Sequence, residues 1–448
     1  MAESTIAAIS TALGEGGIAI VRVSGSNAVK ISTKILKRKN FDIPGKLYLT
    51  SLIDDDANVL DQVLAVCFRS PNSYTGEDIV EIHTHGGIFV ARLCLELLLK
   101  HGATLAQPGE FTRRAFTNGR IDLSQAEGVL GIIKARSLEA VKASARTLGG
   151  GLSKAVNDIH KKILNIQANI EINLDFPEGE TFDASFDLVS EISRTVSDLE
   201  KLLARLENGM IFSNGVSVTI AGRPNVGKSS LLNALLGRER AIVTDIPGTT
   251  RDIISETILI NSLPVILSDT AGIRQTDNII EAEGVKLALN SANESDLCLF
   301  VVDGSQKISD EEKILIDSLA DSSIIVFNKS DLEHVAELDT TLTKIFVSAK
   351  NETGIEELKA AIYDKSLRHS ATPDGGLNAN ARQANDIRDA LEDMREALSL
   401  VMSDSSLMTA DIIAGLMNEA RVCLLRVMGV EASDELLDYM FNRFCVGK

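Results

Sequence analysis

The chain lacks tryptophan and has only five cysteines, which are scattered and without CxxC spacing: Cys67, Cys94, Cys298, Cys423 and Cys445. An odd number of scattered cysteines argues against a disulfide framework and against a zinc site. No run of about eighteen uncharged apolar residues occurs, so no transmembrane helix is expected. The first residues, Met1 to Ser4, lack the basic region of a signal peptide. These absences predict a soluble, cytoplasmic protein without a membrane partner.

Positive charge is also outweighed by negative charge, because 63 Asp and Glu residues against 45 Lys and Arg residues give a formal net charge of −18. Binding to nucleic acid phosphates is driven by Lys and Arg, so this balance argues against nonspecific coating of nucleic acid. A local basic patch stays possible, with a solvated helix or loop surface as the alternative in each case. The candidates are Lys34 to Lys39, Arg113 with Arg114, and a group formed by Lys134, Arg136, Lys142 and Arg146.

What the chain does have is length and apolar residues. Its 448 residues predict two to four domains, and a hydrophobic fraction of 44% is sufficient for substantial cores. Residues 1–118 combine strand patterns at Ile18–Val23, Val63–Phe68 and Ile79–His85 with a helical pattern at Gly87–Leu99. We expect an α+β domain over this first segment.

Residues 119–210 have a helical pattern instead. Ser124 to Glu127 has the form of a capping box, and few helix breakers occur before Pro177. A second helical run covers Phe186 to Leu206. The pattern is again helical in residues 371–448, after a linker rich in Pro, Gly, Ser and Asn. We expect these two helical parts to fold against each other as one domain.

Between them, residues 211–370 alternate strand-like and helix-like runs, which is typical of a parallel sheet. The strand-like runs are 216–221, 264–268, 297–302, 323–328 and 344–348. The predicted fold class is therefore multidomain, with an α+β N-terminal domain, an α-helical central domain and an inserted α/β domain.

A phosphate-binding loop opens this inserted domain. The run Gly222-Arg-Pro-Asn-Val-Gly-Lys-Ser229 matches GxxxxGK[ST] and lies between a strand-like and a helix-like run, as that motif requires. Its backbone amides would surround the phosphates, with Lys228 on the outer phosphates and Ser229 on Mg²⁺.

Three further motifs follow in the order that a GTPase needs. Asp269 to Gly272 follows a strand and suits water-mediated Mg²⁺ binding beside the γ-phosphate. Asn328 to Asp331 suits guanine, because the two oxygens of Asp331 match its pair of donors and adenine lacks that pair. Ser348 to Lys350 matches a loop that supports the base. The inserted domain is therefore predicted to be a P-loop GTPase domain.

Two positions bear on the hydrolytic mechanism. Many small GTPases place a water-orienting Gln after the Asp269 motif, but this chain has Ile273, which cannot orient water. Another group must do so. Asn225, inside the phosphate loop, either shapes the loop or contributes its carbonyl to a cation near the phosphates, and the residues alone leave both readings open.

The whole chain resembles the MnmE (TrmE) family of GTPases that modify the wobble uridine of tRNA. The resemblance is carried by Gly16 to Arg22, Thr75 to Asp78, His85 to Gly87, Pro108 to Phe111, Asp122 to Glu127, Gly222 to Ser230, Thr244 to Arg251 and Cys445 to Lys448. It implies a homodimer held by the N-terminal domains. It also implies a flavoprotein partner, MnmG (GidA), with which an aminomethyl-type group is installed on tRNA.

The resemblance implies further residue roles. Potassium would be bound by Asn225, Thr244, Ile246 and Thr249 and would neutralise charge between the phosphates. Ser229 and Thr250 would bind Mg²⁺, and Glu281 would orient water through a bridging water. A solvated surface carboxylate is the alternative for Glu281. The catalytic residues implied are Glu281, Lys228 and Thr250.

Motifs and resemblance together give one set of GTP contacts. These are Asn225, Val226, Gly227, Lys228, Ser229, Ser230, Thr244, Asp245, Ile246, Pro247, Gly248, Thr249, Thr250, Asp269, Thr270, Ala271, Gly272, Asn328, Lys329, Ser330, Asp331, Ser348, Ala349 and Lys350.

The N-terminal domain looks like a tetrahydrofolate-binding fold, and the family's contacts to 5-formyltetrahydrofolate or a related folate match Arg22, Glu81, Arg120 and Lys448. Relatives often have Lys at the position of Arg120, which retains the charge with a different geometry. Glu81 also alternates with His83 and His85, as metal ligands can, but the polar face of a half-buried strand is the interpretation that we adopt.

Cys445 has two open interpretations, a nucleophile or a buried thiol near the folate pocket. For the protein as a whole, the alternative to a tRNA-modifying GTPase is an assembly switch that binds ribosomal RNA. Relatives of that kind usually add a KH domain or a second GTPase domain, and neither is visible here. A GTPase that polymerises or remodels membranes is disfavoured by the acidic charge and the absence of a lipid-seeking segment.

Overall fold

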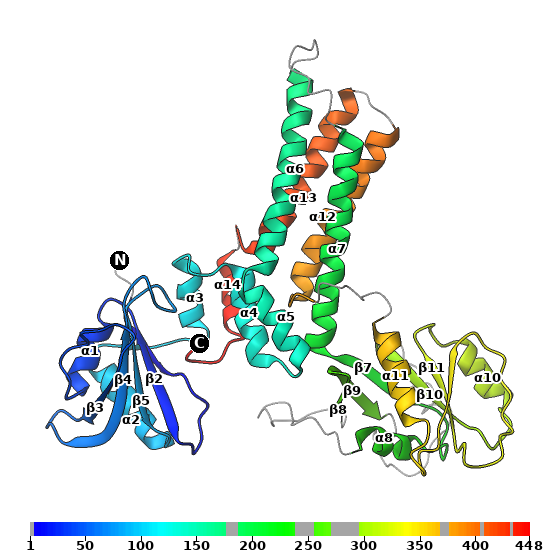
Figure 1. Ribbon diagram of the computed structural model, residues 1–448, viewed down its shortest axis with the longest axis horizontal. Helices are drawn as coiled ribbons and strands as arrows, with labels where there is room; N and C mark the ends of the chain where they lie inside the picture. Colours follow the sequence, from blue (N-terminus) through cyan, green and yellow to red (C-terminus); the bar gives the residue numbers. More distant parts are fainter. Residues whose placement is uncertain are drawn as a thin grey trace. The chain divides into compact units, whose positions relative to one another are not determined.

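The computed structural model describes residues 4–175, 187–237, 255–269, 295–367, 376–403, 407–430 and 433–448. The chain forms two compact units, one containing residues 1–130, 156–160 and 418–448 and the other containing residues 131–155 and 161–417. Both are drawn in Figure 1. The predicted combination of an α+β part, a helical part and an α/β part is confirmed.

The first unit is built on a six-stranded sheet with the order β3-β4-β5-β2-β1-β6. Its strands are β1 (Ile6–Ile9), β2 (Ile18–Ser24), β3 (Leu47–Ile53), β4 (Val59–Phe68), β5 (Ile79–His85) and β6 (Thr104–Leu105). Neighbouring strands are antiparallel except for β1 with β6, which are parallel. The three strands predicted from the sequence, β2, β4 and β5, are all present.

One face of this sheet is covered by α1 (Ala28–Ile35) and α2 (Ile88–Lys100). Alternate strand residues such as Val21, Val80 and Ile82 are buried against these helices. Their neighbours, including Ile18, Arg22 and Glu81, therefore face the other way, because successive side chains of a strand point to opposite faces. The first unit also contains the helices α3 (Glu110–Thr117) and α14 (Asp434–Phe441).

The second unit contains a six-stranded sheet with the order β12-β11-β10-β7-β9-β8. Its strands are β7 (Val216–Ala221), β8 (Ser255–Ile260), β9 (Leu263–Asp269), β10 (Leu297–Asp303), β11 (Ile324–Asn328) and β12 (Thr343–Phe346). Five of them are parallel and match the five predicted runs. The strand β8 was not predicted. It pairs antiparallel with β9 at the edge of the sheet.

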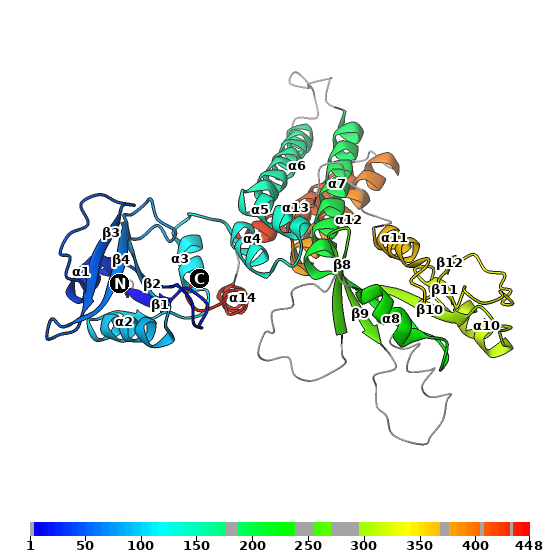
Figure 2. The same ribbon diagram turned by 60° about the horizontal axis from the view of Figure 1, so that its bottom comes forward.

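Helices cover both faces of this parallel sheet (Figure 2). In β10, Leu297, Leu299 and Val301 pack with α8 (Lys228–Leu236) and α11 (Ile355–Ser366), whereas the residues between them pack toward α10 (Asp310–Asp317). A strand that is buried on both faces needs a continuous apolar run, and Leu-Cys-Leu-Phe-Val-Val is one.

Long helices flank this sheet in the sequence. They are α4 (Leu123–Lys134), α5 (Leu138–Leu148), α6 (Gly151–Asp175), α7 (Leu188–Asn214), α12 (Ala381–Ser403) and α13 (Leu407–Met428). The helix before the sheet, α7, packs along the helix after it, α12. Glu200 pairs with Arg395 at 2.7 Å and Glu207 with Arg388 at 3.1 Å. The parallel sheet is therefore inserted between two helices that contact each other.

The start of α4 differs from the expectation. The reciprocal hydrogen bonds of a capping box join Asp122 and Gln125, with Gln125 N donating to Asp122 Oδ1 at 2.9 Å and Asp122 N donating to Gln125 Oε1 at 3.0 Å. The predicted box of Ser124 and Glu127 is wrong, because both residues already lie inside the helix and are buried. Asp is as good an N-cap as Ser, so two overlapping boxes competed in the sequence.

None of the helices in the described ranges has the length and apolar character needed to cross a bilayer.

Candidate functional site

The phosphate-binding loop follows β7 directly and requires glycine at two positions. Gly222 has φ +143, and a Cβ there would lie 2.3 Å from Val301 O. Gly227 has φ +98, and its Cβ would lie 2.3 Å from Asn328 Nδ2. Both the conformation and the space exclude a side chain. Asn225 between them also has a positive φ, +66, which Asn tolerates better than most residues.

Lys228 is the first residue of α8. Its ammonium group donates to Gly222 O at 2.9 Å and to Arg223 O at 2.8 Å, so it lies against the loop itself. Ser229 and Ser230 follow in the exposed first turn of α8. The N-terminus of a helix presents unpaired amides and a partial positive charge, which favours an anion at this end.

Asn328, at the end of β11, connects this loop to a second one. Its side chain is buried, its Nδ2 donates to Val226 O at 2.9 Å, and its Oδ1 accepts from Ala349 N at 3.1 Å. The run from Asn328 and the run from Ser348 are therefore held against the phosphate-binding loop by one amide. Ligands of open parallel sheets bind at this carboxyl edge of the strands.

The side chain of Asp331 is oriented by its neighbour in that second loop. Ser348 Oγ donates to Asp331 Oδ1 at 2.6 Å, while the Ser330 amide donates to Val347 O at 3.0 Å. The hydrogen bond from Ser348 holds the pKa of Asp331 below its ordinary value, so the carboxylate is ionised and accepting at neutral pH. Lys350 is exposed beside this pair and also lowers that pKa.

Asp303 is a member of this site that the sequence analysis missed. Lys329, which has φ +64, extends its ammonium group to Asp303 Oδ2 at 2.6 Å. Burial raises the pKa of Asp303, but hydrogen bonds from Lys329 and Ser305 outweigh it and the net shift is downward. The available signal was an acid directly after the apolar run of β10.

Several predicted contacts lie outside the described residues. They are Thr244, Asp245, Ile246, Pro247, Gly248, Thr249, Thr250, Thr270, Ala271 and Gly272, together with Ile273 and Glu281. Asp269 is the last residue of β9, the strand next to β7 in the sheet, and its backbone therefore ends near the start of the phosphate-binding loop.

A second polar site lies in the first unit, on the sheet face that α1 and α2 leave open. Arg22 donates from Nε to Glu81 Oε1 at 2.9 Å, and its Nη2 lies 2.8 Å from the same oxygen. Its guanidinium carbon is 5.7 Å from the Tyr74 ring centre and 5.6 Å from that of Phe111. His83 Nε2 lies 3.6 Å from Glu81 Oε2.

The C-terminal segment completes this second site. Arg22 Nη1 donates to Gly447 O at 3.3 Å, Ser10 Oγ donates to the same oxygen at 3.0 Å, and Phe111 N donates to Lys448 O at 3.2 Å. Gly447 has φ +95, and a Cβ there would lie 2.4 Å from Ile9 O. Of the four predicted folate contacts, Arg22 and Glu81 are thus joined directly, and Lys448 follows the residue whose carbonyl Arg22 contacts.

Arg120 is exposed and follows the end of α3. Its side chain passes close to Gly76, because a Cβ added to that glycine would lie 3.2 Å from Arg120 Cγ. Within the described ranges its side chain forms no hydrogen bond or ion pair with the other three.

The five cysteines differ in burial. Cys67, Cys94, Cys298 and Cys423 are buried thiols, and burial raises the pKa of Cys94 and of Cys298 to about 12. Cys445 is exposed, so the interpretation as a buried thiol is wrong.

Comparisons with known proteins agree with this arrangement. A family model described as "GTP-binding protein TrmE N-terminus" matches residues 5–120, and one described as "MnmE helical domain" matches residues 123–445. A tRNA modification GTPase MnmE of Carboxydothermus hydrogenoformans is 42% identical, with 100% of each chain covered. Proteins of the same name from Geobacter sulfurreducens and Pseudothermotoga lettingae are 40% and 38% identical, over 100% and 99% of this chain and 99% of each relative. The chain therefore belongs to the MnmE (TrmE) family of tRNA modification GTPases.

Proposed function

We propose that this protein is a potassium-stimulated GTP hydrolase that, with an MnmG-type flavoprotein, modifies C5 of the wobble uridine of tRNA using a folate one-carbon donor. The observation that carries the GTPase part is the side chain of Asn328, which joins the phosphate-binding loop to the loop of Ser348. The tRNA part is supported by full-length relatives named tRNA modification GTPases.

The phosphate-binding loop fits GTP with Mg²⁺. Its glycines leave no side chain between the backbone amides and a phosphate, and the exposed hydroxyl of Ser229 is an oxygen ligand of the type that Mg²⁺ prefers. In this proposal Lys228 contacts the outer phosphates, Ser229 and Thr250 hold Mg²⁺, and Asp331 accepts the guanine donors. The bound Mg²⁺ would supply charge neutralisation at the phosphates.

Potassium is proposed at Asn225 with Thr244, Ile246 and Thr249. Asn225 supports it because an exposed Asn in the left-handed region of the phosphate-binding loop keeps a carbonyl next to the phosphates. A monovalent cation there would stabilise charge that develops during phosphoryl transfer, the task that an arginine finger performs in other GTPases.

We expect GTP hydrolysis to be at least about tenfold faster in KCl than in NaCl of equal ionic strength. The matched variant is Asn225→Gly, because glycine adopts a φ of +66 without strain while the side-chain carbonyl is lost. Asn225→Gly should bind GTP normally and lose the difference between the two salts. Equal wild-type rates in K⁺ and Na⁺ would contradict the potassium assignment.

The folate is proposed at the second polar site. The Glu81 carboxylate suits the donor edge of a pterin, and Arg22, Arg120 and Lys448 are cations that suit the carboxylates of a folate tail. The carboxylate is held in place by Arg22, and the Tyr74 and Phe111 rings lie beside that guanidinium. These are polar groups on an otherwise apolar surface, as small-ligand sites require.

Glu81→Gln should weaken binding of 5-formyltetrahydrofolate by about tenfold or more, because a charge-assisted hydrogen bond is lost. The change is measured by equilibrium titration of the folate. Glu96→Gln is the control, since it removes one exposed carboxylate from α2. Both variants should hydrolyse GTP at the wild-type rate, and unchanged folate affinity in Glu81→Gln would place the ligand elsewhere.

We also propose a cytoplasmic homodimer formed by the N-terminal domain. The open sheet face carries exposed apolar side chains, among them Ile18 at 61% and Leu49 at 64% exposure, which a second copy would cover. Residues 1–118, 119–210, 211–370 and 371–448 remain our proposed domain boundaries. The homodimer is tested by the mass of the full-length chain in solution.

A further inference from the structure

We propose that a basic platform in the first unit, defined as Lys37, Arg38, Lys39 and Lys46, binds the phosphodiester backbone of tRNA directly. The platform lies in the connection between α1 and β3. The choice of tRNA rests on the proposed function. The existence of an anion site rests on the geometry of the platform.

The platform has a high local charge. Residues 30–51 contain six Lys and Arg residues and one carboxylate, Asp42, which gives a local net charge of +5 in a chain whose net charge is −18. Asp42 pairs with Arg38 at 3.5 Å. Lys37, Lys39 and Lys46 have no carboxylate within ion-pair distance in the described ranges.

Three of the other cations that the sequence singled out are paired with carboxylates. Arg113 pairs with Asp438 at 2.6 Å, and Lys142 pairs with Glu139 at 2.7 Å. Arg114 is buried between Glu77, at 3.2 Å, and Glu110, at 2.8 Å. The basic platform therefore differs from these three positions in keeping lysines that are exposed and without a carboxylate partner in the described ranges, a property that Lys134 and Arg136 share.

The backbone of the platform is held to the sheet. Leu36 and Phe41 are buried on either side of it, with 0% and 6% exposure. Between them, Lys37 N donates to Ser51 O at 2.9 Å and Arg38 N donates to Thr50 Oγ1 at 3.1 Å. A charge cluster on an ordered backbone loses less entropy when it binds a ligand.

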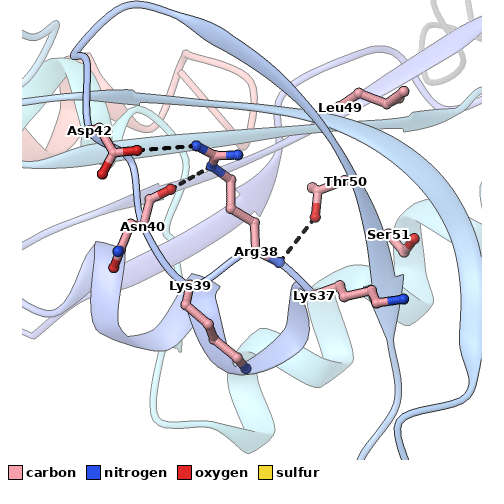
Figure 3. A pocket seen from close by; sticks show the side chains of 8 residues that line it. All are labelled: Lys37, Arg38, Lys39, Asn40, Asp42, Leu49, Thr50 and Ser51. Carbon is pink, nitrogen blue, oxygen red and sulfur yellow. Dashed lines mark hydrogen bonds and ion pairs between the residues drawn. The ribbon is translucent and has the colours of Figure 1, made fainter.

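Three residues of the platform, Lys37, Arg38 and Lys39, line a pocket of about 460 Å³ (Figure 3). Asp42 lies on the guanidinium side of Arg38, and Lys37 and Lys39 extend away from it. Arg38 stacks over the Tyr48 ring with its guanidinium carbon 3.6 Å from the ring centre, and Lys46 Nζ lies 5.4 Å from that centre. Tyr48 thus positions two of the four cations.

Hydroxyl groups line the same pocket. Thr50 Oγ1 already accepts a hydrogen bond from the Arg38 amide, so the hydroxyl hydrogen of Thr50 is available to a ligand oxygen. Ser51 lines the pocket beside Thr50. Lysine ammonium groups with Ser and Thr hydroxyls are the donors that typically contact nucleic-acid phosphates. Contacts of this kind to phosphates would position RNA without selecting its sequence.

The test measures binding of fluorescein-labelled tRNA to the full-length chain by anisotropy at several KCl concentrations. We compare K37Q/K39Q with R92Q/K100Q, which removes the same charge from exposed positions of α2 in the same unit. K37Q/K39Q should weaken binding about tenfold and lower the slope of log Kd against log salt by about 2. The control should stay within about twofold of wild type.

The affinity of K37Q/K39Q for a tRNA that is not a substrate of the modification should fall by the same factor, because phosphate contacts carry no sequence information. The proposal is overturned if wild type binds no tRNA, if K37Q/K39Q binds as wild type does, or if both double variants lose equally. Binding to phosphatidylserine vesicles is measured in parallel. The proposal is also overturned if K37Q/K39Q binds vesicles more weakly than wild type but binds tRNA as wild type does. GTP hydrolysis without RNA, measured on the same samples, tests the proposed function separately.

Discussion

Asp331→Asn is expected to lower the affinity for GTP by about a hundredfold or more and to create affinity for XTP. Guanine offers an N1–H and an exocyclic amine, which need an acceptor with two oxygens, whereas xanthine carries a carbonyl in place of the amine. An amide at position 331 offers one acceptor and one donor. The preference should therefore reverse rather than only weaken.

Ser348 determines which way the new amide would turn. In the native chain its hydroxyl donates to Asp331 Oδ1 at 2.6 Å. In Asp331→Asn the same hydroxyl would donate to the one oxygen that the amide retains. The amide nitrogen would then face the base. Ser348→Ala is the matched variant, because it removes the orientation and leaves the carboxylate.

The measurement is a pair of titrations with labelled GTP and XTP on each variant. Ser348→Ala should lose only about tenfold in GTP affinity and gain no affinity for XTP. Because the pKa of Asp331 lies below its ordinary value, the carboxylate stays ionised across neutral pH, and protonation should weaken GTP binding only in acid. A variant Asp331→Asn that prefers GTP would show that another group reads the base.

Glu281→Gln should reduce the turnover number for GTP by about a hundredfold or more while leaving GTP affinity unchanged. The expectation follows from Ile273, which occupies the position of a water-orienting Gln and has no hydrogen-bonding group. Another group must then act on the attacking water. The group that we propose is the Glu281 carboxylate, whose charge and proton-accepting ability Gln at position 281 lacks. Single-turnover hydrolysis and GTP titration separate the two effects.

The control is Glu283→Gln, two residues along the chain, which removes the same charge. It should keep at least about half of the wild-type turnover. Equal losses of turnover in Glu281→Gln and Glu283→Gln would show that the loss comes from removing a negative charge and not from a specific role of Glu281. A large loss of GTP affinity in Glu281→Gln would instead give this residue a structural role.

Much of the fold could be predicted because apolar periodicity reports burial. β5 alternates in the sequence as its side chains alternate between the helices and the open face, and β10 is apolar throughout because both of its faces are covered. The edge strand β8 was missed because only one of its neighbours is a strand. An edge position places weaker demands on composition than a buried one.

Contacts between distant residues were not predictable in the same way. The pairing of Asp303 with Lys329 joins the ends of two strands, and the capping box of α4 is decided by a shift of two residues. Nothing local in the sequence distinguishes Asp122 from Ser124 as the cap. Likewise, the unpaired lysines of the basic platform and the paired Arg113 look alike in a list of charges. Only the positions of carboxylates in the structure separate them.

The hydrogen bond from Ser10 to Gly447 joins residues 437 positions apart. Ribosomes make proteins from the N-terminus, so the sheet that carries Arg22 and Glu81 can fold long before its last partner exists. A nascent chain with a complete sheet would still lack the carbonyl that orients Arg22. We therefore expect the second polar site to form only after Gly447 has been synthesised, so that shorter nascent chains would bind its ligand poorly.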